Sequence, residues 1–75
     1  MNKEELTDYR RRLLLEYRDT ILKRERLDVY LINNRDKTGT ENELKNRELM
    51  TKQLEVLNEY EELLFCRLVL ELTTN

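Results

Sequence analysis

The chain has 75 residues, one glycine, no proline and a formal net charge of −2, so we expect one small unit and not two domains. It contains no histidine, serine, tryptophan or alanine and a single cysteine, and so lacks most side chains that enzymes use as bases, nucleophiles or metal ligands. We therefore expect no enzyme, no cofactor and no metal site. The near-neutral charge also disfavours general binding to DNA or RNA duplexes or to anionic membranes.

The hydrophobic segments are short. No stretch approaches the roughly 20 apolar residues that cross a bilayer, and no apolar segment follows the charged N-terminus as in a signal peptide. We therefore expect a cytoplasmic protein. The only cysteine, Cys66, lies in the apolar run Leu63–Cys66, where we expect a buried, reduced thiol.

The first predicted element is a helix over residues 3–33. Asn2 followed by Glu5 is typical of an N-terminal cap, and Asn33 or Asn34 is expected to end the helix in the left-handed conformation. At about 100° per residue, its apolar residues form a stripe that we expect to pack on a second helix. The stripe contains Leu6, Tyr9, Leu13, Leu14, Tyr17, Ile21, Leu27, Leu31 and Ile32. A second line, Leu15, Leu22 and Val29, has the seven-residue spacing of a coiled-coil seam.

The only cluster of helix-breaking residues predicts a loop over 34–40, followed by a helix over 41–72. Thr40 and Glu43 fit a capping box at its start. Its apolar stripe contains Leu49, Met50, Leu54, Val56, Leu57, Tyr60, Leu64 and Leu68. From Leu63 to Leu70, however, apolar residues point nearly all round the helix, so something must cover that end.

These elements predict an all-α fold: residues 1–75 form a single antiparallel two-helix hairpin, with helices about 45 Å long. Two packed helices of this size bury little surface, so we expect hairpins to assemble into a homo-oligomeric helical bundle; a monomeric hairpin is the alternative. The predicted oligomer interface consists of Leu15, Leu22, Val29, Leu63, Phe65 and Leu70.

Polar residues recur every seven positions in the second helix, at Asn46, Gln53, Tyr60 and Arg67, and we expect them to follow the middle of its apolar face. Buried polar groups need partners. One interpretation is an internal network in which Arg67 pairs with Glu71 or with a carboxylate of another subunit. The other is a nucleotide pocket in which Arg67 holds an anion, Tyr60 stacks on a base and Gln53 reads a base edge.

Helix one adds polar candidates to the same face. Arg24 lies in its apolar stripe, and Arg10 lies at the stripe's edge. A loop centred near residue 37 sets Arg24 beside Thr51 and Gln53, and Arg67 beside Asp8 and Tyr9. The predicted ligand-binding residues are therefore Arg67, Tyr60, Gln53, Arg24, Arg10 and Tyr17. The run Arg10–Arg12 spreads over three helix faces and is either a solvated collar or a phosphate contact.

The second helix also resembles a known pattern, L-L-x-x-Q-L-x-x-M-x-x-Y-x-x-x-L-x-x-R-I. The matching residues are Leu49-Met50, Gln53-Leu54, Leu57, Tyr60, Leu64 and Arg67-Leu68. This pattern resembles small hairpin proteins of phages and prophages, including the short hairpin proteins of crAss-like phages. Glu16-Tyr17, Leu27 and Tyr30-Leu31 are similar to the first helix of that family, E-Y-x-x-L-x-x-x-I-x-K-L-x-x-F-L. The resemblance covers residues 14 to 70, and Thr20 and Arg24 depart from it where the family has apolar residues.

The resemblance implies a phage or prophage protein acting in the cytoplasm of its bacterial host. By analogy of size, shape and setting, it is similar to phage sponges that sequester cyclic oligonucleotide or cyclic ADP-ribose signals of bacterial immunity. We therefore expect a counter-defence protein that binds such a ligand between subunits without cleaving it. One alternative is an inhibitor that blocks a host machine, such as a CRISPR nuclease or a polymerase, through Glu48, Glu55, Glu59 and Glu62. Another is a coiled-coil assembly protein in which the polar row sets the register.

Overall fold

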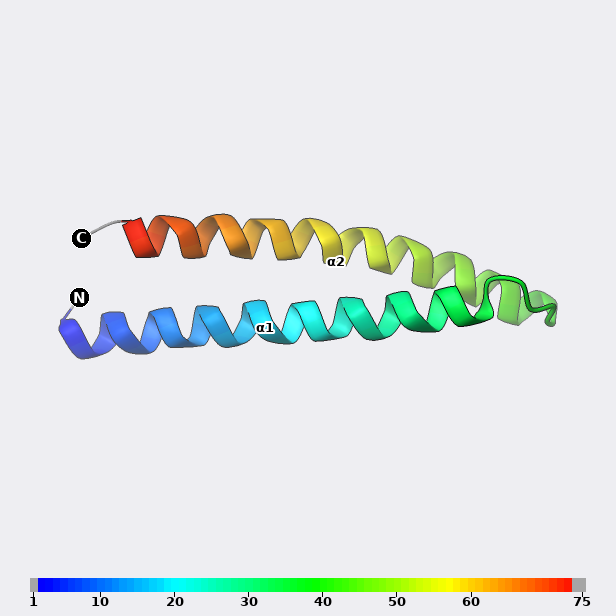
Figure 1. Cartoon of the computed structure of the whole chain (residues 1–75), viewed down its shortest axis with the longest axis horizontal. Coiled ribbons are helices and arrows are strands. Elements are labelled where there is room, and N and C mark those ends of the chain that lie inside the picture. The colour runs from blue at the N-terminus through cyan, green and yellow to red at the C-terminus, as the bar shows by residue number, and fades with distance from the viewer. Residues whose placement is uncertain (1, 74–75) are drawn as a thin grey trace.

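A computed structural model describes residues 2–73, which form two helices, α1 (Lys3–Asn34) and α2 (Glu41–Thr73), and no strand. The helices lie side by side and antiparallel, with the start of α1 and the end of α2 at one end of the molecule (Figure 1). The hairpin measures 55 × 17 × 16 Å. The all-α, two-helix hairpin expected from the sequence is thus observed, and each helix ends one residue later than predicted.

Side chains cap the start of both helices. The Asn2 side chain accepts a hydrogen bond from the Glu5 backbone amide at 2.8 Å, and the Glu5 carboxylate accepts one from the Asn2 amide at 3.4 Å. At the start of α2, the Thr40 hydroxyl accepts a bond from the Glu43 amide at 3.2 Å. Each cap satisfies an amide of the first turn that has no partner within the helix.

The end of α1 differs from the prediction. No described residue has a positive φ, so neither Asn33 nor Asn34 is left-handed, and Arg35 keeps a right-handed conformation with φ −56° and ψ −41°. The Asn34 side chain instead donates to the Tyr30 carbonyl at 2.7 Å. The left-handed cap is unnecessary because other groups satisfy the carbonyls at this end of the helix.

Arg47 of α2 holds the connection between the helices. Its guanidinium donates to the backbone carbonyls of Asn34, at 3.1 Å, and of Lys37. Gly39 lies under the same group: a Cβ atom there would be 2.6 Å from a carboxylate oxygen of Glu43 and 3.0 Å from a guanidinium nitrogen of Arg47. The glycine is therefore required for close approach and not for backbone conformation.

The two helices meet along one line of residues, the hairpin seam, whose members recur at alternating steps of three and four as in a coiled coil. On α1 it contains Leu6, Arg10, Leu13, Tyr17, Thr20, Arg24, Leu27, Leu31 and Asn34. On α2 it contains Arg47, Met50, Leu54, Leu57, Glu61, Leu64, Leu68 and Glu71. All are buried or half-buried in the hairpin.

Polar contacts fix the register of the seam. Near one end Arg10 pairs with Glu71, and near the other Arg47 bonds to Asn34. Moving 24 residues along α1, from Arg10 to Asn34, moves 24 residues back along α2, from Glu71 to Arg47. A single antiparallel register therefore holds along the whole hairpin.

The apolar core is small. Leu13, Leu64 and Leu68 are the only large apolar side chains buried in the described chain, and Tyr9 and Tyr17 pack against them. Thr20 is also buried, and its hydroxyl donates to the Glu16 carbonyl at 2.8 Å, so this departure from the family pattern leaves no unsatisfied group.

The predicted stripes were too wide. Leu14 and Ile32 of α1 and Leu49 and Val56 of α2 are 55–63% exposed, because two helices in contact cover only the narrow seam between them. The buried thiol was also a wrong prediction: Cys66 is exposed, two positions before the buried Leu68. The hairpin thus exposes far more apolar surface than it buries.

We predict that Leu64→Ala lowers the free energy of unfolding by about 3 kcal/mol, since it opens a cavity at the most buried side chain, which is 1% exposed. Leu72→Ala, at a leucine 77% exposed, is the matched control and should change it by less than about 0.5 kcal/mol. Urea unfolding followed by circular dichroism measures both. Equal losses would show that Leu64 is not the centre of the core.

Candidate ligand-binding face

The polar row of α2 does not lie where we predicted. Asn46, Gln53, Tyr60 and Arg67 are exposed, and each immediately precedes a residue of the hairpin seam. One position along a helix is a rotation of about 100°, so the row flanks the seam and is not part of it. The prediction that these groups follow the middle of the packed face was therefore wrong.

A matching row on α1 completes one face of the hairpin. Tyr9, Glu16, Lys23 and Tyr30 recur every seven residues, and each also immediately precedes a seam residue. We call these two rows together the polar face. Because the helices are antiparallel, the rows run alongside each other, and two hydrogen bonds join them.

The first of these bonds joins Arg67 to Tyr9, with the guanidinium donating to the phenol oxygen at 2.9 Å. Tyr9 was one of the two neighbours predicted for Arg67, whereas Glu71, its predicted partner in a network, pairs with Arg10. In the second bond the Tyr60 hydroxyl donates to Glu16 at 3.1 Å. Both bonds are exposed, so an incoming ligand can compete for them.

These bonds favour one protonation state of each group. The hydrogen bond to Glu16 raises the pKa of Tyr60, because deprotonation would place a phenolate beside a carboxylate. The hydrogen bond to Tyr9 raises the pKa of Arg67. At neutral pH the face therefore presents a neutral phenol and a full positive charge.

Two shallow grooves lie along the polar face. One, of about 350 Å³, is lined by Tyr9, Arg12, Leu13, Glu16 and Arg67. The other, of about 420 Å³, is lined by Lys23, Arg26, Leu27, Tyr30, Met50, Gln53 and Leu57. Cationic groups thus stand beside aromatic rings, with Glu16 as the one carboxylate in either lining. Such a surface suits a planar, anionic ligand.

Arg24 and Arg10, both predicted to bind ligand, lie in the hairpin seam. The Arg24 Nε donates to both oxygens of Glu61, at 3.1 and 3.0 Å, so its predicted position beside Thr51 and Gln53 was wrong. Arg10 pairs with Glu71 at 3.5 Å. Both arginines thus connect the helices, and their carboxylate partners neutralise the charge that a ligand would need.

Tyr17 is also part of the packing. It is half-buried against the leucine core, and its ring lies 6.2 Å from that of Phe65 at an angle of 41°. Tyr60, in contrast, is 39% exposed on the polar face. Of the six predicted ligand residues, the structure brings Arg67, Tyr60 and Gln53 onto that face and places the other three within the hairpin contact.

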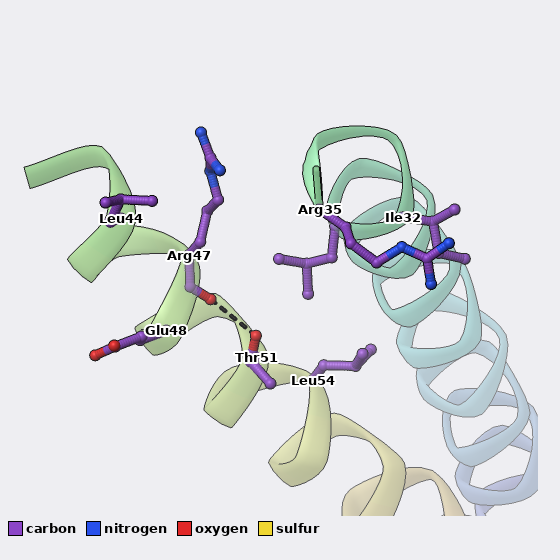
Figure 2. A pocket seen from close by; sticks show the side chains of 8 residues that line it. Ile32, Arg35, Leu44, Arg47, Glu48, Thr51 and Leu54 are labelled. Carbon is purple, nitrogen blue, oxygen red and sulfur yellow. Dashed lines mark hydrogen bonds between the residues drawn. The ribbon is translucent and has the colours of Figure 1, made fainter. Parts of the chain in front are cut away.

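A larger groove, of about 600 Å³, lies near the loop. Its lining comes from both helices and consists of Leu31, Ile32, Arg35, Leu44, Arg47, Glu48, Thr51 and Leu54 (Figure 2). Arg47 already bonds to loop carbonyls, and the Thr51 hydroxyl donates to the Arg47 carbonyl at 2.9 Å. Its polar groups are therefore largely engaged, and no tyrosine lines it.

The predicted oligomer residues lie on three surfaces. Leu15, Leu22 and Val29 are on the side of α1 that faces away from α2. Leu63 and Leu70 are exposed beside the polar row of α2. Phe65 lies on the opposite flank, against Tyr17. A single contact cannot cover all three.

Sequence reasoning missed the α1 half of the polar face. Tyr9 was assigned to an apolar stripe, and Glu16, Lys23 and Tyr30 were not considered as site residues. Their seven-residue spacing, which matches the spacing of the polar row of α2, was the available signal. Arg12 and Arg26 lie next to this row in the two grooves.

Within residues 2–73, no cluster of three or more histidine, cysteine, aspartate or glutamate side chains has a metal-binding arrangement. None of the helices in this range is long and apolar enough to span a bilayer.

The fold and the polar face together define a small helical-hairpin binding protein. The Sequestin family model matches residues 7–70, most of the chain, and the protein belongs to this family. The family name denotes sequestration, that is, binding of a partner. Searches of curated proteins and of solved structures found no match.

We predict that Glu61→Ala lowers the free energy of unfolding by about 2 kcal/mol, because it leaves the half-buried Arg24 guanidinium without its carboxylate. The double variant Arg24→Leu/Glu61→Leu should recover most of that loss, since two apolar side chains replace the ion pair. Thermal unfolding of both variants measures the effect. A double variant less stable than Glu61→Ala would contradict it.

Proposed function

We propose that this protein is phage-encoded and counters bacterial immunity by sequestering a cyclic nucleotide-type signal without cleaving it. The polar face carries the proposal. Three tyrosines, Tyr9, Tyr30 and Tyr60, lie there beside the cationic groups of two grooves, although the chain as a whole is acidic. Tyrosine rings stack on bases, and guanidinium groups hold phosphates.

The chemistry of the individual groups supports a nucleotide ligand. Arg67 keeps its positive charge and offers donors beyond the one that it gives to Tyr9. Gln53 lines the second groove, where its amide can both donate to and accept from a base edge. The Sequestin name supports capture in place of turnover. Capture needs binding groups alone.

The grooves of a single hairpin are shallow, so we propose that the ligand is held between copies of the chain in a homo-oligomer. Small-molecule sites usually enclose most of their ligand. Fifteen large apolar side chains of the described chain are exposed, which favours assembly. The setting that we propose is the cytoplasm of the host bacterium, where such signals are made.

A second candidate is an inhibitor that binds a basic surface of a host protein. Glu48, Glu55 and Glu62 recur every seven residues on α2, and with Glu59 they form an exposed acidic surface. Sequestration of a protein would also fit the family name. Binding to one purified host protein, unaffected by changes on the polar face, would favour this candidate.

We predict that a cyclic di- or trinucleotide, or a cyclic ADP-ribose-type molecule, raises the melting temperature of the protein, because a ligand that binds only the folded state stabilises it. A thermal-shift screen identifies the ligand, and calorimetry gives its affinity. If no member of these classes shifts the melting temperature or produces binding heat, the nucleotide proposal is wrong.

For the ligand found, we predict that Arg67→Ala weakens binding at least about tenfold by removing a phosphate contact. Arg18→Ala is the matched control, since it removes the same charge from an exposed site outside the polar face and should change affinity little. Tyr60→Leu should also weaken binding about tenfold, whereas Tyr60→Phe should not, because phenylalanine keeps the stacking ring. Equal effects of Arg67→Ala and Arg18→Ala in calorimetry would contradict a specific site.

A further inference from the structure

We propose that a second copy of the chain packs antiparallel on α2 along one defined line of residues, the outer seam. These residues are Asn46, Leu49, Gln53, Val56, Tyr60, Leu63, Arg67 and Leu70. They recur at alternating steps of three and four, the same pattern as the hairpin seam. This interface specifies the contact that the proposed ligand site between copies requires.

The exposure of the outer seam shows that α1 does not cover it. Leu49, Val56, Leu63 and Leu70 are each 63–64% exposed, whereas Leu64, in the hairpin seam of the same helix, is 1% exposed. One helix therefore carries two coiled-coil lines, and the hairpin uses one. A helix with two such lines is typical of a bundle with more than two helices.

The sequence of the outer seam favours an antiparallel partner of the same kind. Its polar members, Asn46, Gln53, Tyr60 and Arg67, alternate with its apolar members. In a parallel pair in register, like positions meet, so Arg67 would face Arg67 across a packed contact, which is unfavourable. In an antiparallel pair each polar residue faces an apolar one, so the charged groups are kept apart.

The hairpin itself shows which flanking positions meet in an antiparallel pair. Residues immediately before a seam position come together across its helices, as in the bonds from Arg67 to Tyr9 and from Tyr60 to Glu16. On the outer seam the residues immediately before the polar members are Lys45, Lys52, Glu59 and Cys66. Their charges therefore select the register.

One register pairs opposite charges. When the two copies are centred on residue 58, Lys52 of each copy meets Glu59 of the other, and Lys45 of each meets Cys66 of the other. A shift of seven residues in one direction sets Lys52 against Lys52, and a shift in the other sets Glu59 against Glu59. The centred register is thus the one with two attractive pairs and no like-charge pair.

The same register completes the candidate site. It places Arg67 across from Leu49 of the second copy and Tyr60 across from Val56 of the second copy. The aliphatic stem and the ring can pack there, while their polar ends remain directed to Tyr9 and Glu16 of their own α1. The second copy therefore adds a third wall to the groove, and the site is incomplete without it.

Cross-linking tests this interface without any ligand. We expect Lys45→Cys to form a covalent dimer with a short bismaleimide, and peptide mass spectrometry to locate the link between position 45 and Cys66. The link must join two chains, because positions 45 and 66 of one helix are about 32 Å apart. The unchanged protein should not cross-link, since its two Cys66 thiols are separated by the same distance.

Lys52→Cys is the matched control for register. It lies seven residues along the same line, and its cross-linking to Cys66 should be at least about tenfold slower than that of Lys45→Cys, because those positions are offset by about 10 Å. Faster cross-linking at position 52 would overturn the register, and efficient dimerisation through Cys66 alone would overturn the orientation. A monomer mass in sedimentation with no covalent dimer would overturn the interface. Because no ligand is present, these results are independent of the calorimetry on nucleotides.

The two charge pairs provide a second test. Lys52→Glu should weaken dimerisation about tenfold, since it replaces two attractive pairs by two repulsive ones, and Lys52→Glu/Glu59→Lys should restore it. Lys45→Glu makes the same charge change opposite Cys66 and should have little effect. Sedimentation at several concentrations measures the dissociation constants. Equal weakening by Lys45→Glu and Lys52→Glu, or failure of the double variant to recover, would overturn the pairing.

Discussion

The narrowness of the contact between α1 and α2 determines the rest of the structure. Two long helices can cover only a line of each other's surface, and here that line buries three leucines and one threonine. Ordering each residue of the chain is entropically unfavourable, and so small an apolar core offsets little of that entropy. The remaining apolar residues, Leu63 and Leu70 among them, stay in water unless another chain covers them. Self-association is therefore the physical complement of this fold.

Polar groups within the seam give this contact its specificity. Leucines at seven-residue spacing pack almost equally well after a slip of seven residues, so they do not define an alignment. The Arg24 to Glu61 pair does, because the same slip would place Leu54 or Leu68 where Glu61 stands and leave the guanidinium without a partner. The pairs Arg10 to Glu71 and Arg47 to Asn34 do the same near the ends. A fixed register in turn places Tyr9 beside Arg67 and Glu16 beside Tyr60.

The sequence predicted the hairpin well and the direction of its side chains less well. Loop residues and caps are local signals, so the helices could be placed to within a residue at their C-terminal ends. The inward face is not local. On α2 the series beginning at Arg47 and the series beginning at Asn46 both have coiled-coil spacing, and choosing the wrong one rotates the prediction by about 100°. The partner of Arg24 was missed for a different reason: a long side chain extends along the seam, beyond the residues directly opposite it.

The composition of the outer seam connects assembly with binding. If this line served assembly alone, leucine at positions 53, 60 and 67 would give a more stable contact than the glutamine, tyrosine and arginine that are present. The polar choices reduce the apolar area available to a second copy, yet they place a stacking ring, an amide and a permanent cation at the edge of the same contact. Such a compromise between stability and site chemistry is common where a surface binds a ligand. A second copy of the chain and a captured nucleotide would then share one surface, each completing the contacts that the other leaves open.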